Sequence, residues 1–394
     1  MTSDAREKRE HDLLLGSGSS SLVSSLANNS LNFDKILMVS VGILVLAGLL
    51  MVYSSSSAIS REQFDDSLYY LKKQLLWCLI GILAMLFSMF FNYQYYQKLS
   101  LLLLMISGIA LILVYIPGIG VRSGGSTRWI KISKIGFQPV EIAKLALIIY
   151  MARFLSQRSD HLKSFNKGIL PGLIIILIFI ILLYGQPDFG SIILIGLIMF
   201  IMLLVSGTRI KHIIPLIIVA GIFVCYEVWQ EPYRMRRLIT FLDPWKDPDG
   251  RGYHIIQSFY AFGLGGIFGV GIGSGIQKLY YLPTPHTDFI FSVIGEEMGL
   301  VGSVAIVLLY MVIVWRGISI SLSVKDKFAR LLALGISCLI GIQSAINIAT
   351  VTGSLPTKGI TLPFISYGGS SLVTSLIAVG ILLNVSRYRM LPDR

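Results

Sequence analysis

The chain contains 394 residues, of which 54% are hydrophobic and only 14% are charged, and its formal net charge is +12. Globular chains contain about 25% charged residues, so this composition excludes an ordinary soluble enzyme. It also excludes a disordered or collagen-like chain, because hydrophobic residues dominate and the glycines follow no repeat. The class that remains is a protein that crosses a bilayer several times, in which positive charge is typical of cytoplasmic loops. No basic run alternates with stacking aromatic residues, and we therefore expect no nucleic-acid partner.

Residues 1–34 mix acidic, basic and serine residues and lack the apolar core of a signal peptide. We expect them to form a short, disordered cytoplasmic tail. Residues 35–390 are then one membrane domain. A helix crosses a bilayer core with roughly 20 apolar residues, and ten segments meet or approach this length: 36–54, 74–92, 99–118, 139–157, 168–185, 189–208, 211–229, 289–315, 331–351 and 368–386. The sequence predicts an all-α integral membrane fold with ten transmembrane helices.

Lysine and arginine gather in segments on the same side of the predicted membrane as the N-terminus, such as 153–167 and 316–330. By the positive-inside rule both termini are cytoplasmic, which agrees with an even number of spans. The outer side then carries three long segments, 119–138, 230–288 and 352–367, and loops of this length usually have a function. The longest, between the seventh and eighth helices, contains the apolar stretch YHIIQSFYAFGL, for which we predict a short helix at the membrane surface.

One carboxylate stands where the long outer loop meets the eighth span. Asp288 lies in the sequence LPTPHTDFIFSVIGEE, at the point where a side chain can face water while bordering lipid. Partial desolvation would raise its pKa toward the range of a general base. The alternative is an N-cap of the eighth helix, and composition alone favours this simpler role.

Other ionisable residues fall inside predicted spans. Glu296 and Glu297 lie about 12–14 Å deeper than Asp288 along a helix, where ionisable groups are usually functional or paired. Glu141 and Lys144 are three residues apart and share a helix face. Lys144 could pair with Glu141, pair with Glu296 or Glu297, or bind a phosphate.

Two outer segments are basic. Residues 122–134, RSGGSTRWIKISK, suit a phosphate or sugar ligand, and Trp129 would stack on a sugar or, as the default, anchor at the interface. Residues 234–252 are rich in turn signals, and Arg234, Arg236 and Arg237 could hold a diphosphate or anionic lipid.

The glycine-rich stretch GLGGIFGVGIGSG superficially resembles a phosphate-binding loop. It lacks the GK[ST] ending, and no strand precedes it. We therefore expect its glycines to permit close helix packing or a bent re-entrant turn.

A series of motifs runs along the chain in order: GSTRWI at 125–130, FQPVEIAK at 137–144, QPDFG at 186–190, RLITFLDPWKDPDGRGYHIIQS at 237–258, GLGGIFGVGIGSGIQKLYYLPTPHTDFIFSVIGEEMGLVG at 263–302 and LPTKGITLPFISYGGSS at 355–371. With them the chain resembles, over residues 36–390, the SEDS family (shape, elongation, division and sporulation) of integral-membrane peptidoglycan glycosyltransferases. It is most similar to the cell-division branch, the FtsW type. Two departures are Pro283-Thr284-Pro285 before the HTD turn and Val140 where the family commonly has serine, and neither removes a charged candidate.

The resemblance implies polymerisation of lipid II into glycan strands at the outer face of the cytoplasmic membrane. The family's catalytic aspartate lies in the HTDF motif and maps onto Asp288, which outweighs the cap alternative, although one residue can serve both roles. The implied reaction is an inverting transfer from a glycan on undecaprenyl diphosphate to the 4-hydroxyl of lipid II, with Asp288 as general base.

The other candidate residues follow from these motifs and from the charges described above. We expect substrate or diphosphate contacts from Lys144, Glu141, Arg128, Trp129, Arg234, Arg236, Arg237, His286, Lys358 and Ser366. We expect structural or relay roles for Glu296, Glu297, Asp188 and Gln138. The sequence has no metal-ligand pattern, so no cofactor is certain, and a divalent cation (Mg²⁺ or Mn²⁺) is an expectation from the family alone.

The resemblance also implies partners and a location. A class B penicillin-binding protein that crosslinks the strands, together with other division proteins, would act beside the chain in the bacterial cytoplasmic membrane at the division septum. A lipid II flippase is the alternative, and it would need charges along a path through the helices. Glu296 and Glu297 support it, whereas the clustering of other charges toward the outer half opposes it, at Asp188, Asp288, Glu141 and Lys144. A non-catalytic division scaffold is the third alternative and would tolerate Asp288→Asn.

Overall fold

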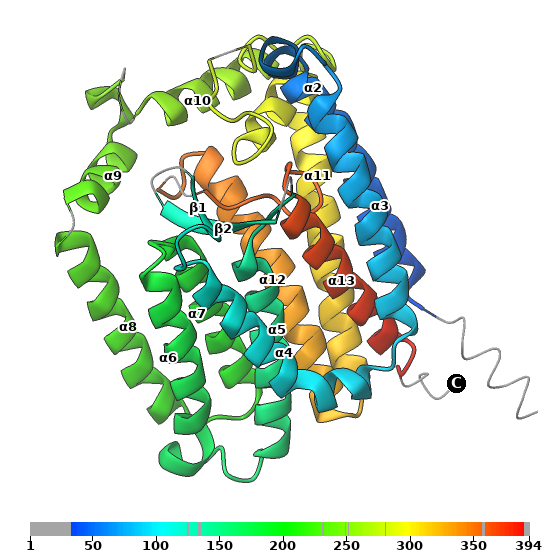
Figure 1. The fold of residues 1–394 in the computed structure, drawn as a ribbon, viewed down its shortest axis with the longest axis vertical. Helices are drawn as coiled ribbons and strands as arrows, with labels where there is room; N and C mark the ends of the chain where they lie inside the picture. Colours follow the sequence, from blue (N-terminus) through cyan, green and yellow to red (C-terminus); the bar gives the residue numbers. More distant parts are fainter. Residues whose placement is uncertain are drawn as a thin grey trace, which may run out of the picture.

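The structure is a computed structural model that describes residues 33–123, 126–132, 135–230, 232–248, 250, 252–279, 281–356 and 359–389. The predicted tail therefore lies outside the described residues except for its last two positions. The described chain is mostly helical, and Figure 1 shows the helices in two groups.

The membrane-length helices follow the predicted apolar segments. They are α2 (Lys35–Phe64), α3 (Tyr69–Phe90), α4 (Tyr93–Leu113), α5 (Pro139–Gln157), α6 (Leu170–Tyr184, continuing a π turn at Phe165–Ile169), α7 (Phe189–Val205), α8 (Ile210–Gln230), α11 (Ile290–Ser323), α12 (Lys327–Val351) and α13 (Gly369–Ser386). Each of the ten predicted segments overlaps one of these helices. In Figure 1, α2, α3, α11 and α13 lie on one side and α6, α7 and α8 on the other, with α5 and α12 between them. Among the described residues, eight helices are long and apolar enough to cross a membrane, whereas α7 is shorter and α5 carries buried charge.

Helix α2 continues ten residues beyond the predicted end of the first span, through a run of serines. The hydroxyls of Ser55 and Ser56 donate to the carbonyls of Met51 and Val52 one turn earlier. Serine usually competes with helix formation by bonding nearby backbone groups, but here those bonds fall on the helix's own carbonyls. The polar run therefore extends the helix above the apolar part.

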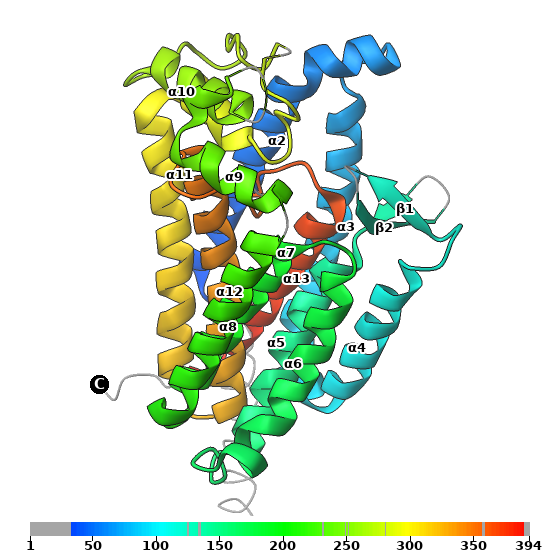
Figure 2. The ribbon, with the colours of Figure 1, turned by 90° about the vertical axis from the view of Figure 1, so that its left-hand side faces the viewer.

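The expectation of an all-α fold is wrong for the segment between α4 and α5. Strands β1 (Gly120–Ser123), β2 (Ser126–Ile132) and β3 (Ile135–Phe137) form an antiparallel sheet in the order β1-β2-β3. Figure 2 shows the sheet beside the upper end of α4, on the side away from α11. The β2 sequence STRWIKI has β-branched and aromatic residues between turn signals, which is a hairpin pattern.

The long segment between α8 and α11 contains two further helices. Helix α9 (Pro232–Leu242) precedes a short 3-10 turn (Pro244–Lys246), and α10 (Tyr253–Gly265) agrees with the predicted short helix. The prediction of turns from 234 onward is wrong up to Leu242, because the Asp-Pro and Gly signals begin only at Asp243. Helix α10 packs on α11, where the hydroxyls of Ser258 and Ser292 are 2.6 Å apart.

A buried charge cluster joins three helices at the other end of the bundle. Asp34 caps α2 by accepting the N–H of Leu37 at 3.0 Å. Its carboxylate pairs with Arg316 of α11 at 2.7 Å and with Arg389 beyond α13 at 2.9 Å. The N–H of Asp34 donates to the Ser386 hydroxyl, 352 residues away along the chain. The start of α2 is therefore fixed to α11 and α13.

Candidate active site

Asp288 lies in the turn that precedes α11. The residue that caps α11 is Phe289, and no side chain makes a capping hydrogen bond there. The N-cap alternative for Asp288 is therefore wrong. Within the described residues, the Asp288 carboxylate forms neither a hydrogen bond nor an ion pair, although the side chain is largely buried.

Burial raises the pKa of Asp288 to about 6, and the positive charge of Arg128 limits this rise. Arg128 is held in β2 by the carbonyls of Gln186 (3.3 Å) and Pro187 (2.5 Å). Its guanidinium also lies 3.8 Å from Asp188, which caps α7 and accepts the Ser191 hydroxyl at 2.8 Å. A carboxylate with a pKa close to neutrality and no partner of its own is suited to accept a proton.

The turn around Asp288 is joined to the segment before α13. The N–H of Tyr367 donates to the carbonyl of His286 at 2.8 Å, and the Ser366 hydroxyl donates to the carbonyl of Thr287 at 2.7 Å. Ser366 also accepts the N–H of Leu362 at 2.8 Å, so its hydroxyl is engaged in holding the two segments together. A Cβ at Gly359 would lie 3.1 Å from the Asp288 carboxylate, so this glycine leaves room beside it.

Two amides on α12 support this junction, and the sequence analysis missed both. The Asn347 amide donates to the carbonyls of Asp288 (3.0 Å) and Ile360 (2.7 Å). One turn earlier, the Gln343 amide donates to the carbonyl of Thr361 at 3.1 Å. Amides four residues apart in an otherwise apolar span share one face, and this pattern could have identified them.

Lys144 ends this polar chain inside the bundle. It pairs with Glu141 at 2.9 Å and donates to the Gln343 side-chain oxygen at 2.9 Å, with only 3% of its side chain exposed. Pairing of Lys144 with Glu141 is confirmed, and neither Glu296 nor Glu297 is its partner, whereas phosphate binding by Lys144 stays a prediction. Gln138, just before α5, donates its backbone N–H to the Ser370 hydroxyl of α13 at 3.1 Å.

His286 is packed between aromatic rings two residues before Asp288. Its ring centroid lies 4.5 Å from that of Tyr70 and 5.6 Å from that of Tyr367. Burial lowers the pKa of His286 to about 4, so the ring is neutral near pH 7. Within the described residues its Nδ1 atom has no hydrogen-bond partner.

Glu296 and Glu297 hold the glycine-rich segment that follows α10. Glu296 accepts the backbone N–H groups of Ile276 (2.7 Å) and Gln277 (3.0 Å). Glu297 pairs with Lys278 at 2.6 Å and accepts the Ser54 hydroxyl of α2 at 2.6 Å. The ammonium of Lys278 also donates to the carbonyl of Gly273 at 2.7 Å. Lys278 was not a candidate, because its partner lies 19 residues away in another element.

The same segment interrupts the hydrogen bonds of α11. Gly299 has φ 64°, and the carbonyls of Glu296 and Glu297 accept the N–H groups of Val270 and Gly271 instead of helical donors. A Cβ at Gly299 would lie 2.3 Å from the backbone nitrogen of Gly269. The glycines therefore permit close backbone approach, as predicted for the stretch that superficially resembles a phosphate loop.

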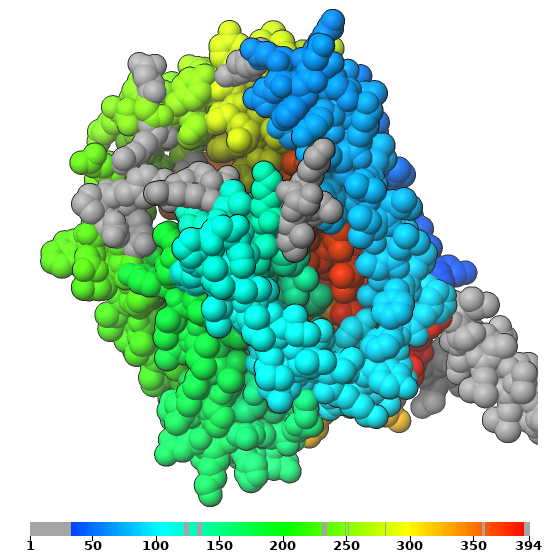
Figure 3. All heavy atoms as spheres, in the orientation of Figure 1, coloured from blue at the N-terminus to red at the C-terminus, as the bar shows by residue number. Residues whose placement is uncertain are grey.

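The remaining basic candidates lie on the periphery. Arg236 on α9 is exposed, and Arg237 lies close enough to His254 to lower its pKa further, after the larger effect of burial. Trp129 is half-buried in β2. Lys358 and the side chain of Arg234 lie outside what the structure describes. Figure 3 shows openings in the surface between α9–α10 and the rest of the molecule.

No group of three His, Cys, Asp or Glu side chains that could hold a metal ion occurs in the described part of the chain. Mg²⁺ commonly binds proteins through one or two carboxylates together with substrate phosphates. Asp288 offers one such carboxylate, so the residues present fit only a cation that is held largely by a substrate.

Comparison with known proteins gives one consistent result. Residues 34–391 match the sequence family of FtsW, RodA and SpoVE, which is described as cell cycle protein. A probable peptidoglycan glycosyltransferase FtsW from Geobacter sp. (strain M18) is 46% identical over 90% of this chain and 96% of the relative. Stage V sporulation protein E of Bacillus subtilis (strain 168) is 44% identical over 90% of this chain and 97% of its own length.

Solved structures share the fold. A chain from a structure on the coordination of polymerization and crosslinking by a peptidoglycan synthase complex matches with a TM-score of 0.76 and 29% identity, covering 91% of this chain and 98% of that chain. The rod shape determining protein RodA of Thermus thermophilus matches with a TM-score of 0.68 and 25% identity, covering 91% of this chain and 98% of its own.

Proposed function

The chain belongs to the FtsW, RodA and SpoVE family of cell cycle proteins, and we propose that it is a peptidoglycan glycosyltransferase of the FtsW type that polymerises lipid II into glycan strands. The observation that supports this most directly is the Asp288 carboxylate, which is largely buried and has no partner within the described residues. Its pKa of about 6 leaves it mostly ionised near pH 7 and still able to take a proton.

In the proposed reaction, the 4-hydroxyl of the lipid II acceptor attacks the anomeric carbon of a glycan carried on undecaprenyl diphosphate. Asp288 takes the hydroxyl proton as the new C–O bond forms, and the bond to the diphosphate breaks with its electron pair leaving on the phosphate oxygen. One displacement inverts the anomeric centre. A positioned general base of this kind typically contributes 10²–10⁴-fold to the rate.

The leaving diphosphate gains negative charge and needs positive groups near Asp288. Arg128 is the best-supported described candidate, because its charge already acts on the Asp288 carboxylate. Arg236 and Arg237 are carried by α9 and are further candidates. Lys144 is buried and paired with Glu141, so we assign to it the support of the loop beneath Asp288 rather than direct contact with phosphate.

The finer topology and setting belong to the same proposal. We place both termini in the cytoplasm, count α5 and α7 as spans for a total of ten, and place the segment from α8 to α11 outside. The structural relative in a peptidoglycan synthase complex supports a class B penicillin-binding protein as partner, with lipid II and the undecaprenyl-diphosphate-linked glycan as substrates. The site of action would be the division septum of the cytoplasmic membrane.

A divalent cation belongs to the proposal as a companion of the substrate diphosphate. Asp288 and the phosphates would hold it, and it would supply charge neutralisation at the leaving group. Glycan synthesis should then fall after treatment with EDTA and return with Mg²⁺ or Mn²⁺.

The decisive experiment is lipid II polymerisation by the purified protein with its co-purified penicillin-binding protein. Asp288→Asn should lose at least about 100-fold of glycan synthesis. Asp66→Asn is the matched control, because Asp66 is an exposed carboxylate that pairs with Lys72 and lies outside the site. Equal synthesis by wild type and Asp288→Asn would reject Asp288 as the base. If neither makes glycan while lipid II crosses a liposome bilayer, the protein is a flippase.

A further inference from the structure

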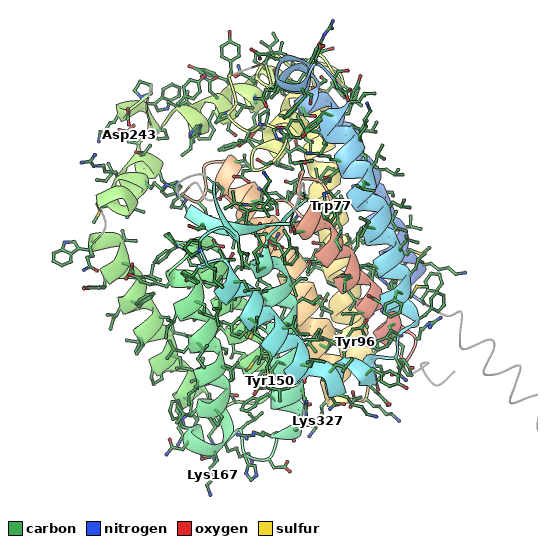
Figure 4. All side chains as sticks on the ribbon, in the orientation of Figure 1. Trp77, Tyr96, Tyr150, Lys167, Asp243 and Lys327 are labelled. Atoms are coloured by element: carbon green, nitrogen blue, oxygen red, sulfur yellow. The ribbon has the colours of Figure 1, made fainter. Side chains whose placement is uncertain are left out.

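A pocket of about 210 Å³ lies at the far end of α5 from Asp288. Helix α5 begins beside the junction that holds Asp288 and extends about 28 Å from there. The pocket is lined by Leu101 of α4 and by Tyr150, Arg153, Phe154, Gln157 and Arg158 around the end of α5. Figure 4 shows Tyr150 in the same half of the molecule as Lys167 and Lys327, which lie at the end opposite α10.

Two arginines face this pocket without acidic partners. Arg153 donates to the Ser100 hydroxyl at 3.1 Å, and Arg158 donates to the carbonyl of Lys167 at 3.0 Å. Among the described residues neither arginine forms an ion pair. Two guanidinium groups beside one pocket repel each other, and an anion that accepts their remaining N–H groups would relieve this repulsion.

An aromatic wall fixes one of these guanidinium groups. The Arg158 guanidinium lies over the Phe154 ring at 4.8 Å, and the Phe154 ring stacks with Tyr150 at 6.3 Å. Between 153 and 167 the sequence adds two lysines and a single carboxylate, Asp160. The surroundings are therefore positive, and the planar donor group is already oriented for a phosphate.

An apolar strip leads away from the pocket along α4. Leu101 lines the pocket, and Met105, Ile109 and Ile112 follow it at helical spacing, each with about half of its surface exposed. Residues spaced by three and four lie on one helix face. Helix α4 is one of the candidate membrane spans, so this strip faces the region of lipid chains. The site combines an anion-binding head with a track for acyl chains.

We propose that this pocket binds the phosphate-bearing headgroup of an anionic lipid, whose chains lie along the α4 strip. Basic pockets between helices at the cytoplasmic side of a membrane are suited to such headgroups. Two lipids offer the same chemistry, an anionic phospholipid such as phosphatidylglycerol and the polyprenyl carrier undecaprenyl phosphate. The site does not depend on glycan transfer, because more than half of the length of α5 separates its lining residues from the junction that holds Asp288.

The test is native mass spectrometry of the full chain in detergent, titrated separately with phosphatidylglycerol, undecaprenyl phosphate and phosphatidylcholine. Arg153→Gln combined with Arg158→Gln should weaken retention of an anionic lipid about 30-fold. Each arginine near the membrane surface attracts an anionic lipid, and the two losses of affinity multiply. The matched control combines Arg209→Gln with Lys211→Gln. It removes the same charge from exposed residues at the same end, next to His212, which contacts the carbonyl of Lys163.

The anionic lipid that wild type retains and the glutamine pair releases is the occupant of the pocket. Phosphatidylcholine should be released at once. A variant that keeps the charge, Arg153→Lys with Arg158→Lys, should retain part of the binding and shows that a loss is not misfolding. Equal retention by wild type and the glutamine pair, or an equal loss in the control, would overturn the proposal. Asp288→Asn should bind the lipid like wild type, so this result stands apart from the test of glycan synthesis.

Discussion

Asp288 and Glu297 lie nine residues apart, both are acidic and mostly or wholly buried, and their surroundings are opposite. Glu297 has a lysine, a hydroxyl and a backbone N–H as partners. Asp288 has none within the described residues, and only the more distant Arg128 acts on it. A buried charge with a full set of partners is tolerated and becomes costly when one partner is removed, whereas a buried charge without partners lowers stability and persists where it serves chemistry. The contrast gives Glu297 a structural role and agrees with the proposed role of Asp288 as the base.

The largest expected effect is a loss of stability when Glu297 is replaced. Glu297→Gln leaves the Lys278 ammonium buried without a counter-charge, and removing one partner of a buried pair typically costs about 3–5 kcal/mol. Reversible unfolding in mixed micelles would measure this loss. Adding Lys278→Met should recover most of it, because no unpaired charge then remains. A Glu297→Gln protein as stable as wild type would show that the pair contributes nothing.

Asp288→Asn should change stability in the opposite direction. The pKa of Asp288 rises on folding from 3.8 to about 6, so its contribution to folding is most favourable below pH 3.8 and falls as pH rises through 6. At pH 7 the ionised form therefore costs up to about 3 kcal/mol, which asparagine would avoid. The unfolding midpoint of Asp288→Asn should be equal to or above that of wild type at pH 7 and converge with it near pH 4. A clear loss of stability would mean that the carboxylate has stabilising partners.

Gly299→Ala tests the break in α11. The break separates Asp288 and Glu297 from the remainder of that helix. The position has φ 64°, and an added Cβ would meet the Gly269 nitrogen. We expect a loss of about 1–3 kcal/mol. Gly196→Ala in α7 is the control, because outside the backbone of its own helix no atom of the described residues lies within 4 Å of the added Cβ, and its φ is ordinary. If the two variants unfold alike, the break is not required by the glycine segment.

The smallest expected effect is a shift of the pH profile. Glycan synthesis should rise with pH through about 6 as Asp288 ionises. Arg128 favours the ionised form, so Arg128→Gln should raise the pKa of Asp288 and move this rise to higher pH. Lys131→Gln, an exposed change in the same strand, should leave the profile in place. A profile that is flat between pH 5 and 7 in wild type would contradict the pKa given for Asp288.

Predictions from the sequence succeeded where the local sequence alone determines the structure. The apolar segments gave the helices, because burial in lipid or protein follows from composition. The predictions also placed Asp288 at the entrance to α11. They failed at β1–β3, where a hairpin pattern was treated only as a loop, and in the α9 region, where arginines before the turn signals continue a helix.

The supports of the site could not be found in this way. Asn347 and Gln343 act on carbonyls of Ile360 and Thr361 that only the fold brings near them. Lys278 meets Glu297 because a glycine segment crosses α11, and the spacing of the two residues gives no hint of it. For Lys144, the sequence left three partners open, and only packing selects Glu141.

The Asp34 cluster has a consequence for how the protein is made. Asp34 leaves the ribosome long before Arg316, and Ser386 and Arg389 follow later still. During synthesis the first helix therefore enters the bilayer before either arginine that pairs with the Asp34 carboxylate has been made. The bundle is completed only when α13 arrives and brings Arg389 to Asp34. The contact between the start of the first helix and the end of the last one therefore forms at the end of assembly. A ribosome-bound intermediate that lacks α13 cannot form it.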